Sequence, residues 1–270
     1  MLSALIIVFR EIIEAGLIVG VALAATAGAP RRGLWVAAGI LAGAAGAGLV
    51  ALGAGRIAAL FSGSGQELFN AGILLLSVAM LTWHNVWMAS HGRAMTEEMR
   101  RLGDAVLAGR KSMLALAAVC GLAVLREGSE IVLFLYSIAV SGSQSPAGLL
   151  LGGGLGLLAG AAVSAALFLG LLTIPTRYLF GVTSGLITLL AAGLASQAVA
   201  FLQQGGYFEV LTATVWDTSW LLADDSIAGR LVHTLVGYTA RPDGAQVVCY
   251  LATVAVILGL MGFGRAARAR

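Results

Sequence analysis

Two copies of one short motif hold the side chains in this sequence that are best suited to bind a metal ion. The pattern Arg-Glu-x-x-Glu occurs at residues 10–14 and again at residues 126–130. In a helix, residues three and four positions apart lie on one side, so the charges of each motif can face one direction. Carboxylate oxygens suit hard or borderline metal ions, and no thiolate is near enough in sequence to favour a soft one. The six charged residues are Arg10, Glu11, Glu14, Arg126, Glu127 and Glu130.

Both motifs lie inside long apolar segments, where charge is costly. One charged side chain at the centre of a membrane helix costs about 2.5–3.5 kcal/mol, so six without compensation would cost on the order of 15–20 kcal/mol. Four ionised glutamates and two arginines leave an excess of two negative charges, which a divalent cation would neutralise and a trivalent cation would exceed by one. We therefore expect the four glutamates to coordinate a metal ion, and the two arginines to hold them in place. The alternative is that each motif is only an intramembrane ion pair.

The composition indicates that a membrane is the solvent of this chain. Of the 270 residues, 59% are hydrophobic and only 11% are charged. The net charge of +3 is spread over short loops, so we expect a lipid bilayer and no nucleic acid as a partner. The two cysteines, Cys120 and Cys249, both lie in apolar runs, which excludes a disulfide framework and a Cys-x-x-Cys site.

Seven apolar segments are long enough to cross a hydrocarbon core of about 30 Å as helices. Period-2 alternation is absent, which favours a helical bundle over a barrel. The sequence thus predicts an all-α, polytopic membrane protein with seven transmembrane helices. The predicted spans are 2–25, 34–54, 67–89, 112–141, 147–174, 179–202 and 245–263.

The position of the two motifs predicts an internal repeat. They fall in the first and fourth spans, so helices one to three and four to six would form two halves of opposite orientation. These halves cover residues 1–89 and 112–202, and a cytoplasmic amphipathic segment at 90–111 joins them within a repeat domain of residues 1–202. We expect this segment to form a helix that lies on the inner membrane surface. An extracytoplasmic loop follows at 203–244, and the last helix and a short tail occupy 245–270. Glycines recur at four-residue spacing in the second and fifth spans, which favours close helix packing there.

The distribution of Lys and Arg predicts the orientation in the membrane. Eleven basic residues fall on one side and three on the other, namely Arg56, Arg230 and Arg241. Because basic residues concentrate in cytoplasmic loops, we expect the N-terminus outside and the C-terminus in the cytoplasm, in the cytoplasmic (inner) membrane.

Other polar residues are weaker candidates for the route of a cation. Glu67 begins the third span and could serve where the cation enters, although a solvated carboxylate at a helix start is an equal alternative. The outer loop holds Asp217, Asp224 and Asp225, which could attract or relay cations but could also be simply solvated. His84 lies near the predicted inner end of the third span, where it is a candidate exit ligand or a histidine at the interface.

At these motifs the sequence resembles the high-affinity iron permease family, the oxidase-dependent iron transporters whose bacterial branch includes the Efe-type iron permease. The resemblance covers nearly the whole chain. Residues 126–130 fit the usual pattern with glycine after the first glutamate, whereas Ile12 replaces that glycine in the first motif.

The resemblance implies a transporter rather than an enzyme, one that imports iron ions and holds no permanent cofactor. It also implies a separate extracytoplasmic ferroxidase or iron-delivery protein, because the chain has no oxidase domain. The acidic motif of the eukaryotic members has no close copy in the outer loop. Ferrous and ferric iron are both left open at this stage.

Two alternatives remain beside iron import. Oxygen ligands discriminate poorly between metals, so the same scaffold could move manganese or lead. A membrane di-metal oxidoreductase would use Glu-x-x-His motifs on facing helices, and this chain has none.

Overall fold

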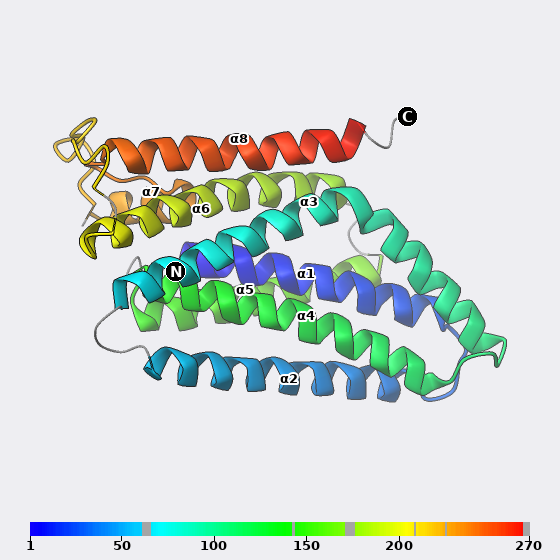
Figure 1. The fold of residues 1–270 in the computed structure, drawn as a ribbon. Coiled ribbons are helices and arrows are strands. Elements are labelled where there is room, and N and C mark those ends of the chain that lie inside the picture. Colours follow the sequence, from blue (N-terminus) through cyan, green and yellow to red (C-terminus); the bar gives the residue numbers. More distant parts are fainter. Residues whose placement is uncertain (61–65, 142–143, 171–175, 208, 225, 267–270) are drawn as a thin grey trace.

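In a computed structural model, the chain forms a bundle of long helices (Figure 1). The structure describes residues 1–60, 66–141, 144–170, 176–207, 209–224 and 226–266. Within these ranges the helices are α1 (Leu2–Ala25), α2 (Arg32–Leu60), α3 (Gln66–Leu107), α4 (Met113–Val140), α5 (Pro146–Phe168), α6 (Thr176–Gln204), α7 (Ile227–Val236) and α8 (Gly244–Ala266). In this part of the chain, β structure is limited to one isolated bridge between Thr214 and Asp243. The all-α prediction is therefore confirmed.

Five helices contain stretches that are long and apolar enough to cross a membrane. These stretches are Arg32–Ala54, Gln66–Trp87, Pro146–Phe168, Gly181–Gln204 and Gly244–Phe263. Helices α1 and α4 have comparable lengths, but each carries the three charges of one motif. The molecule is a multi-pass membrane protein, and the two charged helices lie among the apolar ones (Figure 1).

The third helix differs from the prediction because it does not end near residue 89. Helix α3 continues to Leu107 and changes direction partway along, so the predicted span and the predicted amphipathic segment form one helix (Figure 1). Met99, Leu102 and Val106 are buried in a cluster with residues of α1, α2 and α4. The apolar face of this segment thus packs against protein, whereas we expected it to lie on the membrane surface.

Close packing joins α1 to α5 and α2 to α4. A Cβ on Gly43 of α2 would collide with Gly121 O and would also meet Val124 and Leu125 of α4. Such contacts require glycine, because any side chain would force the two helices apart.

Equivalent contacts occur between α5 and α1. A Cβ on Gly156 of α5 would meet Leu5 O, Val8 Cβ and Phe9 N, and the corresponding atoms around Gly43 are Gly121 O, Val124 Cβ and Leu125 N. Each of these three residues of α1 is separated in sequence from its counterpart in α4 by the same number of positions that separates Arg10 from Arg126. The two helix pairs therefore pack in the same register relative to their motifs.

The unusual Ile12 has a counterpart in this packing. Ile12 lies against Gly160 of α5, where an added Cβ would stand 2.9 Å from the isoleucine Cβ. In the other helix pair, Gly128 takes the position of Ile12 and lies against Ala47 of α2. The pair of α1 and α5 thus places an isoleucine against a glycine, where the pair of α4 and α2 places a glycine against an alanine.

The loop between α6 and α8 folds onto the end of the bundle where α1 begins (Figure 1). Helix α7 packs against α6 and α1. Asp243 and Gln246 cap the start of α8 reciprocally, with Gln246 N donating to Asp243 Oδ1 at 2.8 Å and Asp243 N donating to Gln246 Oε1 at 3.0 Å. The loop therefore has an ordered hydrogen-bonded structure over its described part.

Candidate metal site

The motif of α1 is almost completely enclosed by neighbouring helices. Arg10 Nε donates to Glu14 Oε1 at 2.7 Å, and both side chains are buried. Glu11 is 0% exposed, and neither of its carboxylate oxygens has a hydrogen-bond partner among the described residues. Because an unpaired buried carboxylate is unfavourable, Glu11 is suited to meet a cation.

The motif of α4 faces the same interior. Arg126 Nε lies 3.3 Å from Glu130 Oε1 and 3.9 Å from Glu127 Oε1. The Arg126 guanidinium also stacks 4.6 Å from the ring centroid of Trp87 in α3, a cation–π contact that holds the arginine beside its glutamates. Glu127 and Glu130 are both buried.

His84 of α3 lies between the two motifs. Its Nε2 atom is 2.8 Å from Glu14 Oε2, and its Nδ1 atom is 2.5 Å from Glu130 Oε2. The second pair lacks the alignment of a hydrogen bond, so both atoms still have no partner of that kind. Three helices therefore direct polar atoms into one small space.

Four residues in this space can each offer one atom to a metal ion. The atoms from Glu11, His84, Glu127 and Glu130 lie within 4.8 Å of one another, and all four residues are buried. The oxygens of Glu11, Glu127 Oε2, Glu130 Oε2 and His84 Nδ1 also lack hydrogen-bond partners. A cation bound among them would satisfy each of these atoms at once. The arrangement provides carboxylate oxygens and one imidazole nitrogen, which suits a borderline divalent transition metal.

The structure differs from the sequence prediction at Glu14 and at His84. Glu14 is not in the group of four, because its two oxygens contact Arg10 and His84. His84 was expected near the inner end of its helix but is 1% exposed and lies among the glutamates. The reason is that α3 is longer than its apolar stretch, so His84 is far from either end of the helix.

The neighbouring residue, Asn85, fixes the rotation of α3. Its Nδ2 donates to Ser184 O and to Thr188 Oγ1 of α6, both at 3.1 Å. Consecutive helical residues point about 100° apart, so anchoring Asn85 on α6 turns His84 toward α1 and α4. A histidine and an asparagine side by side within an apolar span were the sequence signal for this part of the site.

The remaining predicted residues lie away from the cluster. Glu67 is in the first turn of α3, seventeen positions before His84, or about 25 Å along the helix. Asp217 pairs with Arg241 at 3.0 Å, and Asp224 accepts a hydrogen bond from Ala240 N at 2.9 Å. Asp225 lies outside the described residues. Asp217 and Asp224 thus stabilise the loop between α6 and α8, and their part in attracting or relaying cations remains a prediction.

A buried cluster of carboxylates and imidazole inside a bundle of apolar helices defines a membrane protein that handles cations. The chain belongs to the iron permease FTR1 family, whose model matches residues 1–269. This confirms the resemblance seen in the motifs, and the chain is a transporter and not an enzyme.

Individual relatives agree with the family. The chain is 29% identical over 274 residues to a ferrous iron permease EfeU from Shigella sonnei (strain Ss046), covering 98% of this chain and 95% of that protein. It is also 29% identical over 250 residues to a ferrous iron permease EfeU from Yersinia pestis, covering 91% of this chain and 87% of that protein. No solved structure matches the chain.

Proposed function

We propose that this protein imports iron across the cytoplasmic membrane through the buried site between α1, α3 and α4. The observation that carries the proposal is the convergence of Glu11, His84, Glu127 and Glu130, whose ligand atoms lie within 4.8 Å of one another. Iron is the cargo of this site and not a permanent cofactor.

Within the site, the residues have different roles. Glu11, Glu127 and Glu130 supply oxygen ligands, and His84 supplies Nδ1. His84 Nε2 donates a hydrogen bond to Glu14, which is itself held by Arg10, and such a contact orients metal-binding histidines in many proteins. Arg126 plays the corresponding part beside Glu130.

Ferrous iron is the species that this ligand set favours. The four glutamates and two arginines leave two negative charges when His84 is neutral, which matches a divalent ion. The imidazole nitrogen also suits borderline Fe²⁺ better than hard Fe³⁺. The names of the relatives from Shigella sonnei and Yersinia pestis specify ferrous iron. Manganese or lead remains an alternative cargo, because the same donors bind several divalent ions.

Transport requires the site to open to each side in turn, and we propose that seven spans in an inverted three-plus-three repeat achieve this. The equivalent surroundings of Gly43 and Gly156 support the repeat. Apolar residues enclose the site at both ends, with Ile7 and Phe134 toward the start of α1 and Met99 and Leu116 toward its end. This enclosure supports the proposal that the bundle passes through an occluded state between the two open ones.

The proposed orientation places the N-terminus outside and the C-terminus in the cytoplasm of the inner membrane. The outer loop and the start of α1 lie at one end of the bundle, and the end of α8 lies at the other (Figure 1). Iron would reach the outer end from a separate extracytoplasmic ferroxidase or delivery protein.

The experiment that tests the proposal is uptake of radioactive iron into proteoliposomes containing the wild type or Glu127→Gln. Ferrous and ferric iron are supplied separately. We expect the wild type to take up ferrous iron and the variant, which removes one charge without changing side-chain size, to lose uptake. Equal uptake by both proteins would exclude the proposed site, and uptake of ferric iron alone would exclude the ferrous assignment.

A further inference from the structure

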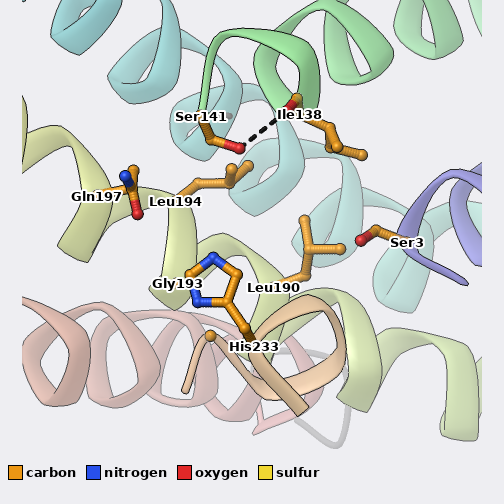
Figure 2. A pocket seen from close by; sticks show the side chains of 9 residues that line it. Ser3, Ile138, Ser141, Leu190, Gly193, Leu194, Gln197 and His233 are labelled. Atoms are coloured by element: carbon orange, nitrogen blue, oxygen red, sulfur yellow. Dashed lines mark hydrogen bonds between the residues drawn. The ribbon is translucent and has the colours of Figure 1, made fainter. Parts of the chain in front are cut away.

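A second polar space lies between the buried metal site and the outer end of the bundle. It is a cavity of about 30 Å³, large enough for about two water molecules or a small cation. Its polar lining consists of Ser3, Ser141, Gln197 and His233, which come from the start of α1, the end of α4, α6 and α7 (Figure 2). Four elements that are distant in sequence thus contribute polar groups to one space.

A hydrogen bond determines which ring nitrogen of His233 carries the proton. Its Nδ1 atom lies 2.5 Å from the backbone oxygen of Tyr238. Because a carbonyl oxygen can only accept, Nδ1 carries the proton, which leaves a lone pair on Nε2 of the neutral ring. Figure 2 shows the imidazole directed toward the cavity. A histidine whose other nitrogen donates to a carbonyl is a common arrangement for a metal ligand.

The other polar groups provide neutral oxygens. Gln197 faces the cavity (Figure 2), and its amide has no hydrogen bond within the described part of the chain. Ser141 lines the cavity with its hydroxyl, which donates to Ile138 O at 2.9 Å. Among the described residues, the lining contains no carboxylate. Such a set binds a cation weakly and releases it readily, as a site on a transport route must do.

The position of the cavity relates it to the buried site. Ser3 precedes Glu11 by eight residues on α1, or about 12 Å along the helix. Ile7 and Phe134, both 0% exposed, belong to the apolar cluster between the two sites. The cavity floor includes Ile138 and Leu190 of the same cluster. A cation in the cavity would therefore be one closed apolar layer away from Glu11.

We propose that this cavity is an outer transit site for a partly hydrated divalent transition-metal ion, with His233 Nε2 and the Gln197 amide oxygen as direct ligands. The proposal rests on the proposed function, because it concerns the route by which the cargo reaches the glutamates. Rearrangement of the Ile7–Phe134 layer then passes the ion inward. The nitrogen ligand favours transition metals over Mg²⁺ and Ca²⁺ at this point.

Histidine NMR can test the transit site directly, because the chain contains only three histidines, at positions 84, 91 and 233. The imidazoles are labelled with ¹³C and ¹⁵N, and each signal is assigned by a single substitution to glutamine. The protein is the full chain in nanodiscs, carrying Glu11→Gln together with Glu127→Gln to disable the buried site. We expect added Co²⁺ to broaden the His233 signal at concentrations that leave the His84 and His91 signals sharp.

Other outcomes distinguish the transit site from the proposed function of the buried site. If Co²⁺ broadens His84 in the wild type but leaves His233 sharp in the double variant, the transit site is excluded and the proposed function stands. If His84 of the wild type is unaffected while His233 broadens in the double variant, the buried site is excluded instead. Equal broadening of His91 and His233 would show nonspecific binding and would overturn the transit site. An unchanged far-UV circular dichroism spectrum confirms that each variant has folded.

A transport measurement provides a second test. Replacing His233 by leucine removes the nitrogen ligand at similar size, and we expect the KM for ferrous iron to rise about tenfold while the maximal rate changes less than about twofold. Gln197→Leu should raise the KM in the same direction. Gln66→Leu serves as the control, because Gln66 is an exposed residue of α3 outside the cavity lining. An unchanged KM in both cavity variants would overturn the proposal.

Discussion

His84 Nε2 lies 2.8 Å from Glu14 Oε2, and this contact directs the other ring nitrogen toward Glu130. The second glutamate of the first motif therefore acts on the histidine, and the first glutamate faces the metal space. The second glutamates of both motifs contact this one histidine, Glu14 at Nε2 and Glu130 at Nδ1, yet only Glu130 belongs to the group of four possible ligands. The site is thus asymmetric although its two halves share one motif.

Replacing Glu14 by glutamine should weaken metal binding without abolishing it. The amide can no longer hold the Nε2 proton of His84 as a charged acceptor, so the ring loses orientation. Loss of such a supporting contact typically reduces metal affinity about 10- to 100-fold. Equilibrium binding of Mn²⁺ to the purified protein, followed by electron paramagnetic resonance, measures the effect. Glu127→Gln is the comparison, and an equal or smaller loss in Glu127→Gln would contradict the different roles assigned to these residues.

Substitution of His84 should change which metal is preferred. His84→Asp replaces the nitrogen ligand by an oxygen, and oxygen-only sites suit Mn²⁺ better than nitrogen-containing sites do. We expect Mn²⁺ to compete with ferrous uptake about tenfold more strongly in this variant than in the wild type. The measurement is the Mn²⁺ concentration that halves ferrous uptake in proteoliposomes. His84→Asn is the control that removes the imidazole without adding a charge, and an unchanged Mn²⁺ concentration in His84→Asp would rule out a ligand role for His84.

The sequence was sufficient to predict a helical membrane protein and the two charged motifs, because both depend on local patterns. Apolar length predicts a helix, and a spacing of three and four residues places Arg10 and Glu14 together, as the 2.7 Å contact shows. The place of His84 depends on how α3 packs, and local spacing carries no information about that. The anchor that turns His84 inward, between Asn85 and Ser184, joins residues almost a hundred positions apart.

The packing partners of the glycine-rich helices could also not be predicted from local sequence patterns. Four-residue glycine spacing in α2 and α5 predicts close approach to some helix, but it does not say which one. The structure pairs α2 with α4 and α5 with α1. The predicted end of the third span agrees with the apolar stretch Gln66–Trp87, but the sequence did not show that α3 continues beyond it and packs there against α1, α2 and α4.

The outer loop should keep its ion pair in moderately acidic conditions. Hydrogen bonds from the side chain and backbone of Ser219, together with Arg241, lower the pKa of Asp217 to about 2. A lowered folded-state pKa means that Asp217 stabilises the loop above its ordinary pKa of 3.8, and that this contribution is lost as the pH falls through about 2. The ¹³C signal of the Asp217 carboxylate should therefore titrate well below that of an unpaired aspartate.

Two variants identify the cause of the low Asp217 pKa. Ser219→Ala removes the hydroxyl donor at 2.6 Å and should raise the midpoint of the titration. Arg241→Ala should also raise it, but by less, because the Arg241 contacts are weaker contributors than the Ser219 hydroxyl. A larger rise in Arg241→Ala than in Ser219→Ala would contradict this order.

The contact between Ile12 and Gly160 predicts a compensating pair of substitutions. Ile12→Gly should destabilise the protein by about 2–5 kcal/mol, because it leaves a cavity against α5. Gly160→Ala should cost about 1–3 kcal/mol, because its Cβ would stand 2.9 Å from the Ile12 Cβ. Combined, they reproduce the Gly128–Ala47 contact of the other helix pair, so the double variant should be more stable than the sum of the single effects predicts.

Thermal unfolding of the purified protein in detergent measures this coupling between α1 and α5. The control is Gly154→Ala on the same helix, where an added Cβ meets no atom within 4 Å. This variant should unfold like the wild type and should not rescue Ile12→Gly. Strict additivity of Ile12→Gly and Gly160→Ala would show that the two residues do not share a contact. Additivity would also remove the packing explanation for the isoleucine in the first motif, because Ile12 would then be accommodated without Gly160.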